Sequence, residues 1–180
     1  KAQRNYGVDE LEASILEAFK DLPIAIVSFL VASFLPRIGY KRAMLIGLGL
    51  VYMACIVMYF GNSFATAKLL FATVGVSFAL IKVSVYSLIG TVTENQQEHN
   101  SLMSSIEGVF MIGIALAYFL FPAFNSETNP DAWLNVYWLL AGISGVSFAF
   151  LFLAKSENQV EVPGVNLLDD FRQMFQLMAK

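Results

Sequence analysis

The sequence predicts an all-α fold, a polytopic bundle of transmembrane helices, and two observations carry this prediction. First, 57% of the 180 residues are hydrophobic and 14% are charged, whereas an average soluble domain is about a quarter charged. Second, the chain contains five largely apolar stretches that are long enough to cross a bilayer, which takes about 20 residues for ~30 Å of hydrocarbon. We therefore expect a protein whose surface faces lipid.

Each predicted span is rich in Leu, Ile, Val, Phe and Ala, with glycine and serine scattered through it, as in packed membrane helices. Together they form a predicted bundle whose spans, in chain order, are 15–35, 43–60, 64–92, 103–124 and 132–154. Turn-forming or polar residues connect them at 36–42, 61–63, 93–100 and 125–131. Residues 1–14 are predicted to be an outer loop. Because the chain starts at Lys1 without a signal segment, we expect it to be part of a longer protein.

Residues 155–180 are predicted to be a cytoplasmic linker that ends in an amphipathic helix. From residue 166 onward, apolar side chains recur at helical spacing on one side, and acidic, basic and amide side chains fill the other side. Such a helix lies in the membrane interface or packs on a neighbouring domain, and the sequence leaves both interpretations open.

The distribution of Lys and Arg places the 36–42 loop in the cytoplasm. With this orientation the cytoplasmic side holds Arg37, Lys41, Arg42, Lys155, Arg172 and Lys180. The opposite side then holds Lys1, Arg4 and Lys68, which agrees with the positive-inside rule. We expect the plasma membrane or a bacterial inner membrane as the location.

Several classes of function are excluded by composition. The net charge of −3 and the lack of a long basic run argue against a nucleic-acid partner. The single Cys55 cannot form an internal disulfide, and neither a metal-binding nor a cofactor-binding pattern is present in the sequence. No nucleophile elbow or phosphate-binding glycine loop indicates an enzyme. We therefore predict a protein that is not an enzyme and has no cofactor.

Charged side chains inside a span cost about 2.5–3.5 kcal/mol at the helix centre, so each requires an explanation. Lys82 lies near the middle of the third predicted span, with Gly75, Ala79 and Tyr86 on the same helical face. Small residues beside a lysine and a tyrosine suit close helix packing or the wall of a polar cavity. The sequence therefore predicts that Lys82 binds substrate; the alternative is a structural lysine that snorkels or pairs with a neighbouring helix.

Glu107 is the predicted partner of Lys82. It lies about one turn inside the fourth predicted span, which runs the opposite way, so the two groups lie at comparable depth. An ion pair would offset much of the cost of both charges and could exchange a proton or a substrate group. Tyr118 lies on the same face further along and is predicted to belong to the site. The alternative is that Glu107 only caps the start of its helix.

Glu17, Lys20 and Asp21 occupy the outer part of the first predicted span. The spacing allows Glu17 to pair with Lys20, and Pro23 loosens the backbone after Asp21. These residues either line an outer vestibule, in which case Asp21 joins the substrate and coupling site, or mark the interfacial end of the helix.

The first connection and its flanks read ASFLPRIGYKRAMLIGLGL. This segment resembles the loop between the second and third helices of major facilitator superfamily transporters, whose motif is G-x-x-x-D-R/K-x-G-R-R/K. Arg37, Gly39 and Lys41 or Arg42 occupy motif positions, and the resemblance implies that they form a gating loop. Pro36 stands where the motif has aspartate, so the family's cytoplasmic gating contact is not fully represented.

The Gly-Tyr-Lys variant of the motif is similar to the fucose-permease-like, sugar:proton branch of that superfamily. Mapped in this way, the five spans correspond to helices 2 to 6 of the amino-terminal half, which is built from inverted three-helix repeats. The resemblance implies a secondary transporter that moves a small polar solute, such as a sugar, with protons by alternating access. Its partners would be the solute, membrane lipid and the remainder of the same transporter. The alternative is a non-transporting helical membrane scaffold or subunit.

Overall fold

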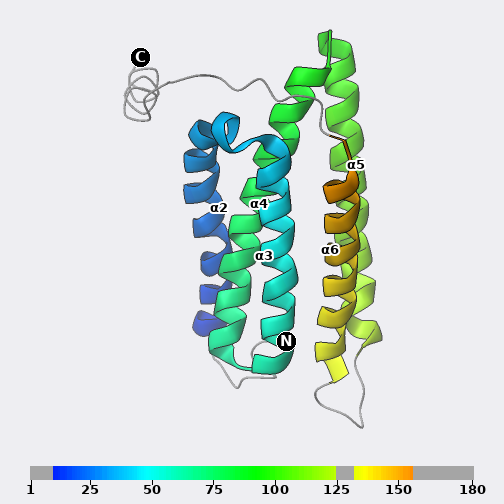
Figure 1. The fold of residues 1–180 in the computed structure, drawn as a ribbon. Helices are drawn as coiled ribbons and strands as arrows, with labels where there is room; N and C mark the ends of the chain where they lie inside the picture. Colours follow the sequence, from blue (N-terminus) through cyan, green and yellow to red (C-terminus); the bar gives the residue numbers. More distant parts are fainter. Residues whose placement is uncertain (1–9, 125–131, 156–180) are drawn as a thin grey trace.

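The structure, a computed structural model, describes residues 10–124 and 132–155 (Figure 1). Of residues 10–13, 32–34, 36, 37 and 121 it describes the backbone alone. The described part is helical, with α2 (Glu10–Ile38), α3 (Tyr40–Gly61), α4 (Phe64–Val92), α5 (Gln96–Ala123), the short 3₁₀ helix η1 (Ala132–Leu134) and α6 (Asn135–Leu153). The predicted all-α helical bundle is confirmed.

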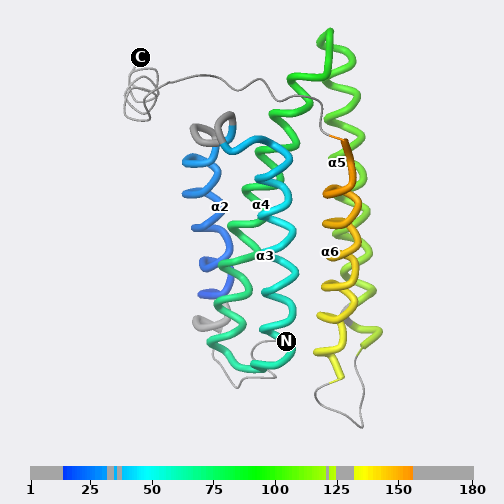
Figure 2. Tube along the Cα trace, viewed as in Figure 1, coloured from blue at the N-terminus to red at the C-terminus, as the bar shows by residue number. Residues whose placement is uncertain are grey.

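Successive helices run in opposite directions (Figures 1 and 2). Helix α4 packs against both α2 and α3, while α3 also packs against α6. The main contact of α5 is with α4, and none of its residues from Gln96 to Leu120 is buried. The α2–α3 turn, the α4–α5 turn and the end of α6 lie at the same end of the bundle, the upper end in Figure 1. We call this the upper end below.

In the described part of the chain, four helical stretches are long and apolar enough to cross a membrane. They are Tyr40–Gly61, Phe64–Val92, Gln96–Leu120 and Ala132–Leu153. The first predicted span, 15–35, lies within α2, which is not one of these four. Residues 10–14 of the predicted outer loop belong to α2, whereas its other residues and the predicted amphipathic helix lie outside the described residues.

A single residue, Gly39, separates α2 from α3, so the prediction of a loop over 36–42 is wrong. The amide of Gly39 donates to the carbonyl oxygen of Leu35 at 2.9 Å, and its own carbonyl oxygen accepts from the amide of Ala43 at 3.0 Å. Its φ of 89° lies in the region that favours glycine. The prediction relied on Pro36 as a helix terminator, but the backbone remains helical through residue 38.

Helix α5 begins at Gln96, earlier than the predicted residue 103. The side chain of Asn95 accepts a hydrogen bond from the amide of Glu98 at 2.9 Å. The carboxylate of Glu98 accepts one from the amide of Glu94 at 3.1 Å. These bonds satisfy amides that a helix start leaves free. The polar residues from Gln96 onward therefore form the first turns of α5. The prediction placed them in a loop because it counted only the length of the apolar stretch.

Glycines allow the close approach of the helices. A Cβ added to Gly75 would collide with the carbonyl oxygen of Lys20, so α4 touches the backbone of α2 there. Between α3 and α6 the fit is reciprocal. A Cβ at Gly49 would lie 3.8 Å from the Phe148 ring, and a Cβ at Gly145 would lie 3.5 Å from the Tyr52 ring. Each helix thus places an aromatic ring against a glycine of the other helix.

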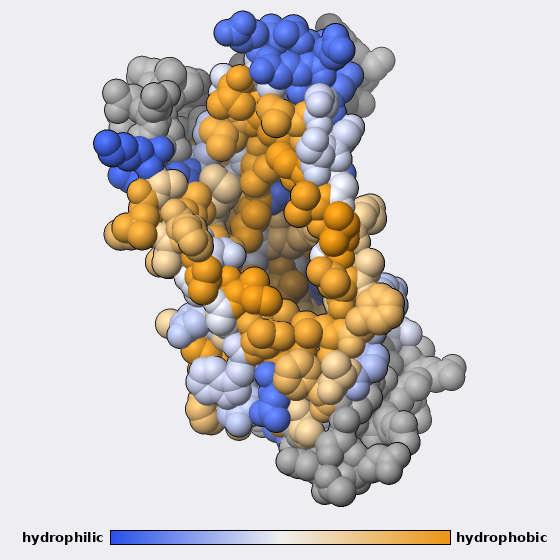
Figure 3. All heavy atoms as spheres, turned by 90° about the vertical axis from the view of Figure 1, so that its right-hand side faces the viewer, coloured by the Kyte–Doolittle hydropathy of each residue, from blue (hydrophilic) through white to orange (hydrophobic). Residues whose placement is uncertain are grey.

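The surface carries the apolar side chains that a membrane protein turns toward lipid. Hydrophobic side chains gather across the middle of the face shown in Figure 3, and hydrophilic ones gather at its upper end. Large hydrophobic residues are widely exposed, for example Phe119 at 76% and Leu153 at 78%. The bundle therefore presents a broad apolar surface whose natural surroundings are lipid or other membrane helices.

Candidate functional site

An ion pair joins α4 to α5 in the middle of the bundle. The ammonium nitrogen of Lys82 lies 3.3 Å from a carboxylate oxygen of Glu107, and the two side chains are 37% and 36% exposed. Lys82 stands about 15 Å from the upper end of α4, and Glu107 about 16 Å from the start of α5, at ~1.5 Å per residue. The ion pair predicted from matching depth is confirmed.

This placement also corrects the alternative interpretation of Glu107. A carboxylate that caps a helix must lie in its first turn. Because α5 begins at Gln96 and its start is capped by Asn95, Glu107 lies about three turns inside the helix. Its charge is therefore matched by Lys82 rather than by the helix start.

Three aromatic rings surround the ammonium group of Lys82. The nitrogen lies 5.2 Å from the ring centre of Tyr86, 5.5 Å from that of Phe78 and 5.8 Å from that of Phe110. Phe78 lies one turn before Lys82 and Tyr86 one turn after it on the same face of α4, and Phe110 reaches across from α5. Ring faces attract a cation within about 6 Å, so these rings stabilise the charge together with Glu107.

The pair and its rings border a pocket of about 280 Å³ between α4 and α5. Apart from the two charges and the Tyr86 hydroxyl, its wall is hydrocarbon. The lining residues are Phe78, Ile81, Lys82, Val85, Tyr86, Ile106, Glu107 and Phe110. Because a charge pair in such surroundings interacts more strongly than in water, separating it requires a new partner for each charge.

Of the other predicted site residues, one lines the pocket and two lie away from it. Tyr86 lines the pocket. Tyr118, in contrast, is 77% exposed and lies eleven residues beyond Glu107, about 16 Å along α5. Asp21, on α2, forms an ion pair with Lys20 at 3.4 Å, and neither residue lines the pocket. The structure thus brings Lys82, Glu107 and Tyr86 together and leaves Tyr118 and Asp21 apart from them.

Two details of the sequence interpretation change. Lys20 pairs with the adjacent Asp21 rather than with Glu17, whose side chain is exposed. The α4 face that includes Gly75 and Lys82 serves two purposes: Gly75 is buried against the backbone of α2, whereas Lys82, two turns further along, faces α5.

The predicted gating residues lie at the upper end of the bundle. Gly39 forms the α2–α3 turn. The ammonium group of Lys41 donates a hydrogen bond to the carbonyl oxygen of Phe152 at 3.0 Å and another to a carbonyl oxygen two residues later. Arg42 is exposed, and the side chain of Arg37 lies outside the described part. The observed contact of this segment is thus with the end of α6.

The rings of Phe78 and Phe110 were not predicted as site residues. Phenylalanine faces lipid so often in membrane helices that neither residue is distinctive by type. The available signal is spacing: Phe78 precedes Lys82 by four residues and Phe110 follows Glu107 by three, and such neighbours share a helix face.

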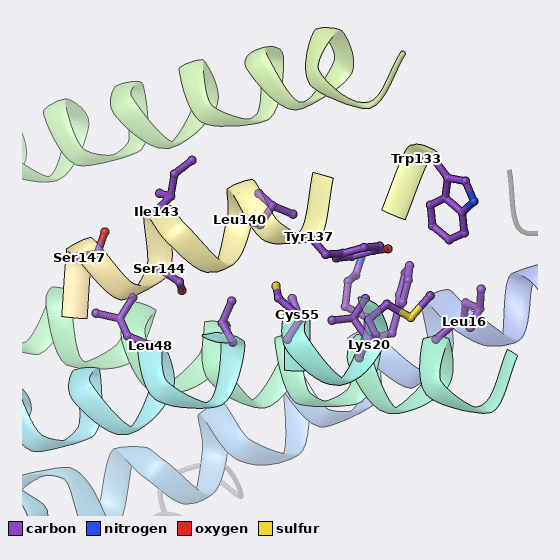
Figure 4. Close-up of a pocket in the computed structure, with 16 residues that line it drawn as sticks. Leu16, Lys20, Leu48, Cys55, Trp133, Tyr137, Leu140, Ile143, Ser144 and Ser147 are labelled. Carbon is purple, nitrogen blue, oxygen red and sulfur yellow. The ribbon is translucent and has the colours of Figure 1, made fainter. Parts of the chain in front are cut away.

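A second, larger cavity of about 570 Å³ lies between α6 and the α2, α3 and α4 group (Figure 4). Leu48 and Cys55 of α3 face Leu140 and Ile143 of α6 across it, and Lys20 lies toward one end. Lys20 is the charged residue of its lining, and the partner of Lys20, Asp21, lies outside the lining. The larger cavity therefore does not have two opposite charges on its wall, as the smaller pocket does.

The sequence was compared with known protein families to identify the class of membrane protein to which this chain belongs. A family model described as the Major Facilitator Superfamily matches residues 2–175. The chain belongs to the Major Facilitator Superfamily. As a member of this superfamily, it comes from a secondary transporter, an integral membrane protein, and such proteins are generally not enzymes. Searches of curated proteins and of solved structures gave no match.

Proposed function

We propose that this superfamily member carries a small polar solute together with protons, and that the Lys82–Glu107 pair is its substrate and coupling site. The ion pair itself carries the proposal. Two charges held in the middle of membrane-spanning helices are expensive, and a pocket opens beside them. The α2–α3 segment resembles a sugar-transporting branch of the superfamily, and this resemblance makes a sugar one candidate for the solute.

The chemistry of the pair suggests how a proton and a solute share the site. A proton on Glu107 removes its charge and weakens its hold on Lys82, which then becomes available to a polar group of the solute. Lys82 and Tyr86 are the titratable side chains of α4 that line the pocket with Glu107. Loss of the proton returns the charge to Glu107, which then pairs again with Lys82 or holds a cationic group of the solute, so proton and solute binding are linked through this one carboxylate.

The surroundings of the pair favour this role over a scaffold. In a scaffold subunit, Lys82 and Glu107 would be expected to lie buried against each other or against a partner chain, without a solvent-accessible cavity beside them. Lys82 and Glu107 are each about one-third exposed, and the adjoining pocket leaves room for a small solute. As part of the proposal, the upper end of the bundle faces the cytoplasm of a plasma or bacterial inner membrane, and the remainder of the transporter covers the exposed helices.

The test is uptake by the complete transporter in proteoliposomes, driven by a proton gradient. Lys82→Ala and Glu107→Gln are each expected to abolish coupled uptake. Lys68→Ala and Glu17→Gln are the matched controls, because they remove the same charges from α4 and α2 outside the pocket. Uptake at the normal rate in both pocket variants would contradict the site assignment.

A further inference from the structure

We propose that the pocket between α4 and α5 selects a compact zwitterion, a solute of the amino-acid or betaine class whose cation and anion lie one or two bonds from a shared carbon. This inference rests on the proposed function, since it assigns a ligand class to the same site.

The two charges of the pocket are adjacent and opposite. Lys82 and Glu107 are 3.3 Å apart, so a ligand that inserts between them must offer an anion to the first and a cation to the second within a short distance. A zwitterion does this and leaves the site neutral. A ligand with one charge satisfies one partner and leaves the other without a counter-charge in an apolar wall, which is strongly unfavourable.

The rings give the cationic end of such a ligand a second set of contacts. Phe78, Tyr86 and Phe110 already surround an ammonium group at 5.2 to 5.8 Å. Aromatic rings with a nearby carboxylate are the surroundings that bind ammonium and quaternary ammonium groups. When the side chain of Lys82 turns toward the ligand's anion, the ligand's cation can occupy the space beside Glu107 and these rings.

The remainder of the wall argues against a sugar. Beyond the ion pair, Tyr86 supplies the polar side-chain group of the lining, and the other lining residues are Phe78, Ile81, Val85, Ile106 and Phe110. A sugar carries several hydroxyls, and each that is buried without a partner is unfavourable. A compact zwitterion with a small aliphatic body matches the wall instead, and the volume of about 280 Å³ suits a small solute.

The experiment measures binding to the detergent-solubilised full-length transporter by ligand-induced stabilisation. The zwitterions are glycine betaine, L-alanine and L-leucine. Isocaproate and isoamylamine retain the body of leucine with one charge, and D-glucose is the neutral polar probe. We expect at least one zwitterion to bind about tenfold or more tightly than every other probe. Tighter binding of glucose or of a singly charged probe, or no stabilisation by any of the three zwitterions, would overturn the inference.

Two variants test whether Lys82 binds the anionic group of the ligand and Glu107 binds its cationic group. Lys82→Met should remove the preference for leucine over isoamylamine, and Glu107→Gln should remove the preference for leucine over isocaproate. Lys68→Met, on α4 but outside the pocket, should change neither preference. If either pocket variant fails to fold, Phe110→Leu keeps both charges and removes one ring. It should weaken zwitterion binding several-fold, and unchanged binding would contradict the proposal.

The outcomes separate this inference from the function on which it rests. Proton-coupled uptake of glucose that depends on Lys82 and Glu107, without binding of a zwitterion, refutes the ligand class and retains the transport site. Zwitterion uptake that is unchanged in Lys82→Ala and Glu107→Gln refutes both the site and the ligand class argued from it.

Discussion

The ammonium nitrogen of Lys41, at the start of α3, lies 3.0 Å from the carbonyl oxygen of Phe152, at the end of α6. It also donates a hydrogen bond to the carbonyl oxygen of Ala154. The last turn of a helix leaves carbonyl groups without amide partners and carries partial negative charge. Lys41 therefore caps α6 from a neighbouring helix and joins two elements that lie far apart in the sequence.

Replacement of Lys41 by methionine should destabilise the transporter by about 1–2 kcal/mol, because the end of α6 loses two charge-assisted hydrogen bonds. Arg42→Met is the control, since Arg42 is exposed and should cost less than about 0.5 kcal/mol. The measurement is the midpoint of thermal unfolding of the full-length protein in detergent. Equal effects of the two substitutions would show that the cap does not stabilise the fold.

A double-mutant cycle should detect the coupling between Lys82 and Glu107. Lys82→Met and Glu107→Gln each leave one charge without its partner, whereas the double variant removes both charges. We expect an interaction free energy of about 0.5–3 kcal/mol from the unfolding free energies of the four proteins. Additive effects within about 0.3 kcal/mol would mean that the two side chains do not stabilise each other.

Gly75→Ala should destabilise the bundle by about 1–3 kcal/mol, the usual range for overpacking. The added methyl group would collide with the carbonyl oxygen of Lys20, and a helix backbone cannot move aside as a side chain can. Gly90→Ala on the same helix has nothing within 4 Å and should be neutral or stabilising by up to about 1 kcal/mol. Thermal unfolding of the two variants compares the sites; a neutral Gly75→Ala would contradict the close α2–α4 contact.

Removal of the Tyr86 ring should weaken transport, whereas removal of the Tyr118 ring should not. Tyr86→Leu takes one ring from the ammonium group of Lys82, and a ring–cation contact is worth about 0.5–2 kcal/mol, or about 2- to 30-fold in apparent affinity. Tyr118 is 77% exposed, so Tyr118→Leu should leave the half-saturation constant for uptake unchanged. If Tyr118→Leu raised the half-saturation constant and Tyr86→Leu did not, Tyr118 rather than Tyr86 would belong to the site.

Apolar length and charge cost predicted the helical bundle and the Lys82–Glu107 pair, because both depend on free energies that are large and local. The positions at which helices begin and end were harder to predict. Gln96 starts α5 because Asn95 and Glu98 satisfy free amides, a contribution that apolar length does not measure. Residue 36 continues α2 although a proline lacks the amide hydrogen that would bond to the carbonyl oxygen four residues earlier, so residue type alone misplaced the end of this helix.

The rest of the site required three-dimensional information. Tyr118 shares a helical face with Glu107 in projection, but eleven residues place it about 16 Å away along the axis, so periodicity alone overestimated the site. Phe110 belongs to it because α5 lies beside α4 at this depth. That contact depends on the relative position of two helices, which no single segment of the sequence specifies.

The one-residue connection at Gly39 restricts how the bundle can move. A single residue spans no more than two steps of about 3.8 Å between neighbouring Cα atoms, so α2 cannot slide along its axis without dragging α3. Rotation about Gly39 remains available, and Lys41 couples the end of α6 to the same point. A shift of α2 or α3 along its axis is thus passed to the other through Gly39, and the hydrogen bonds of Lys41 link the start of α3 to the end of α6.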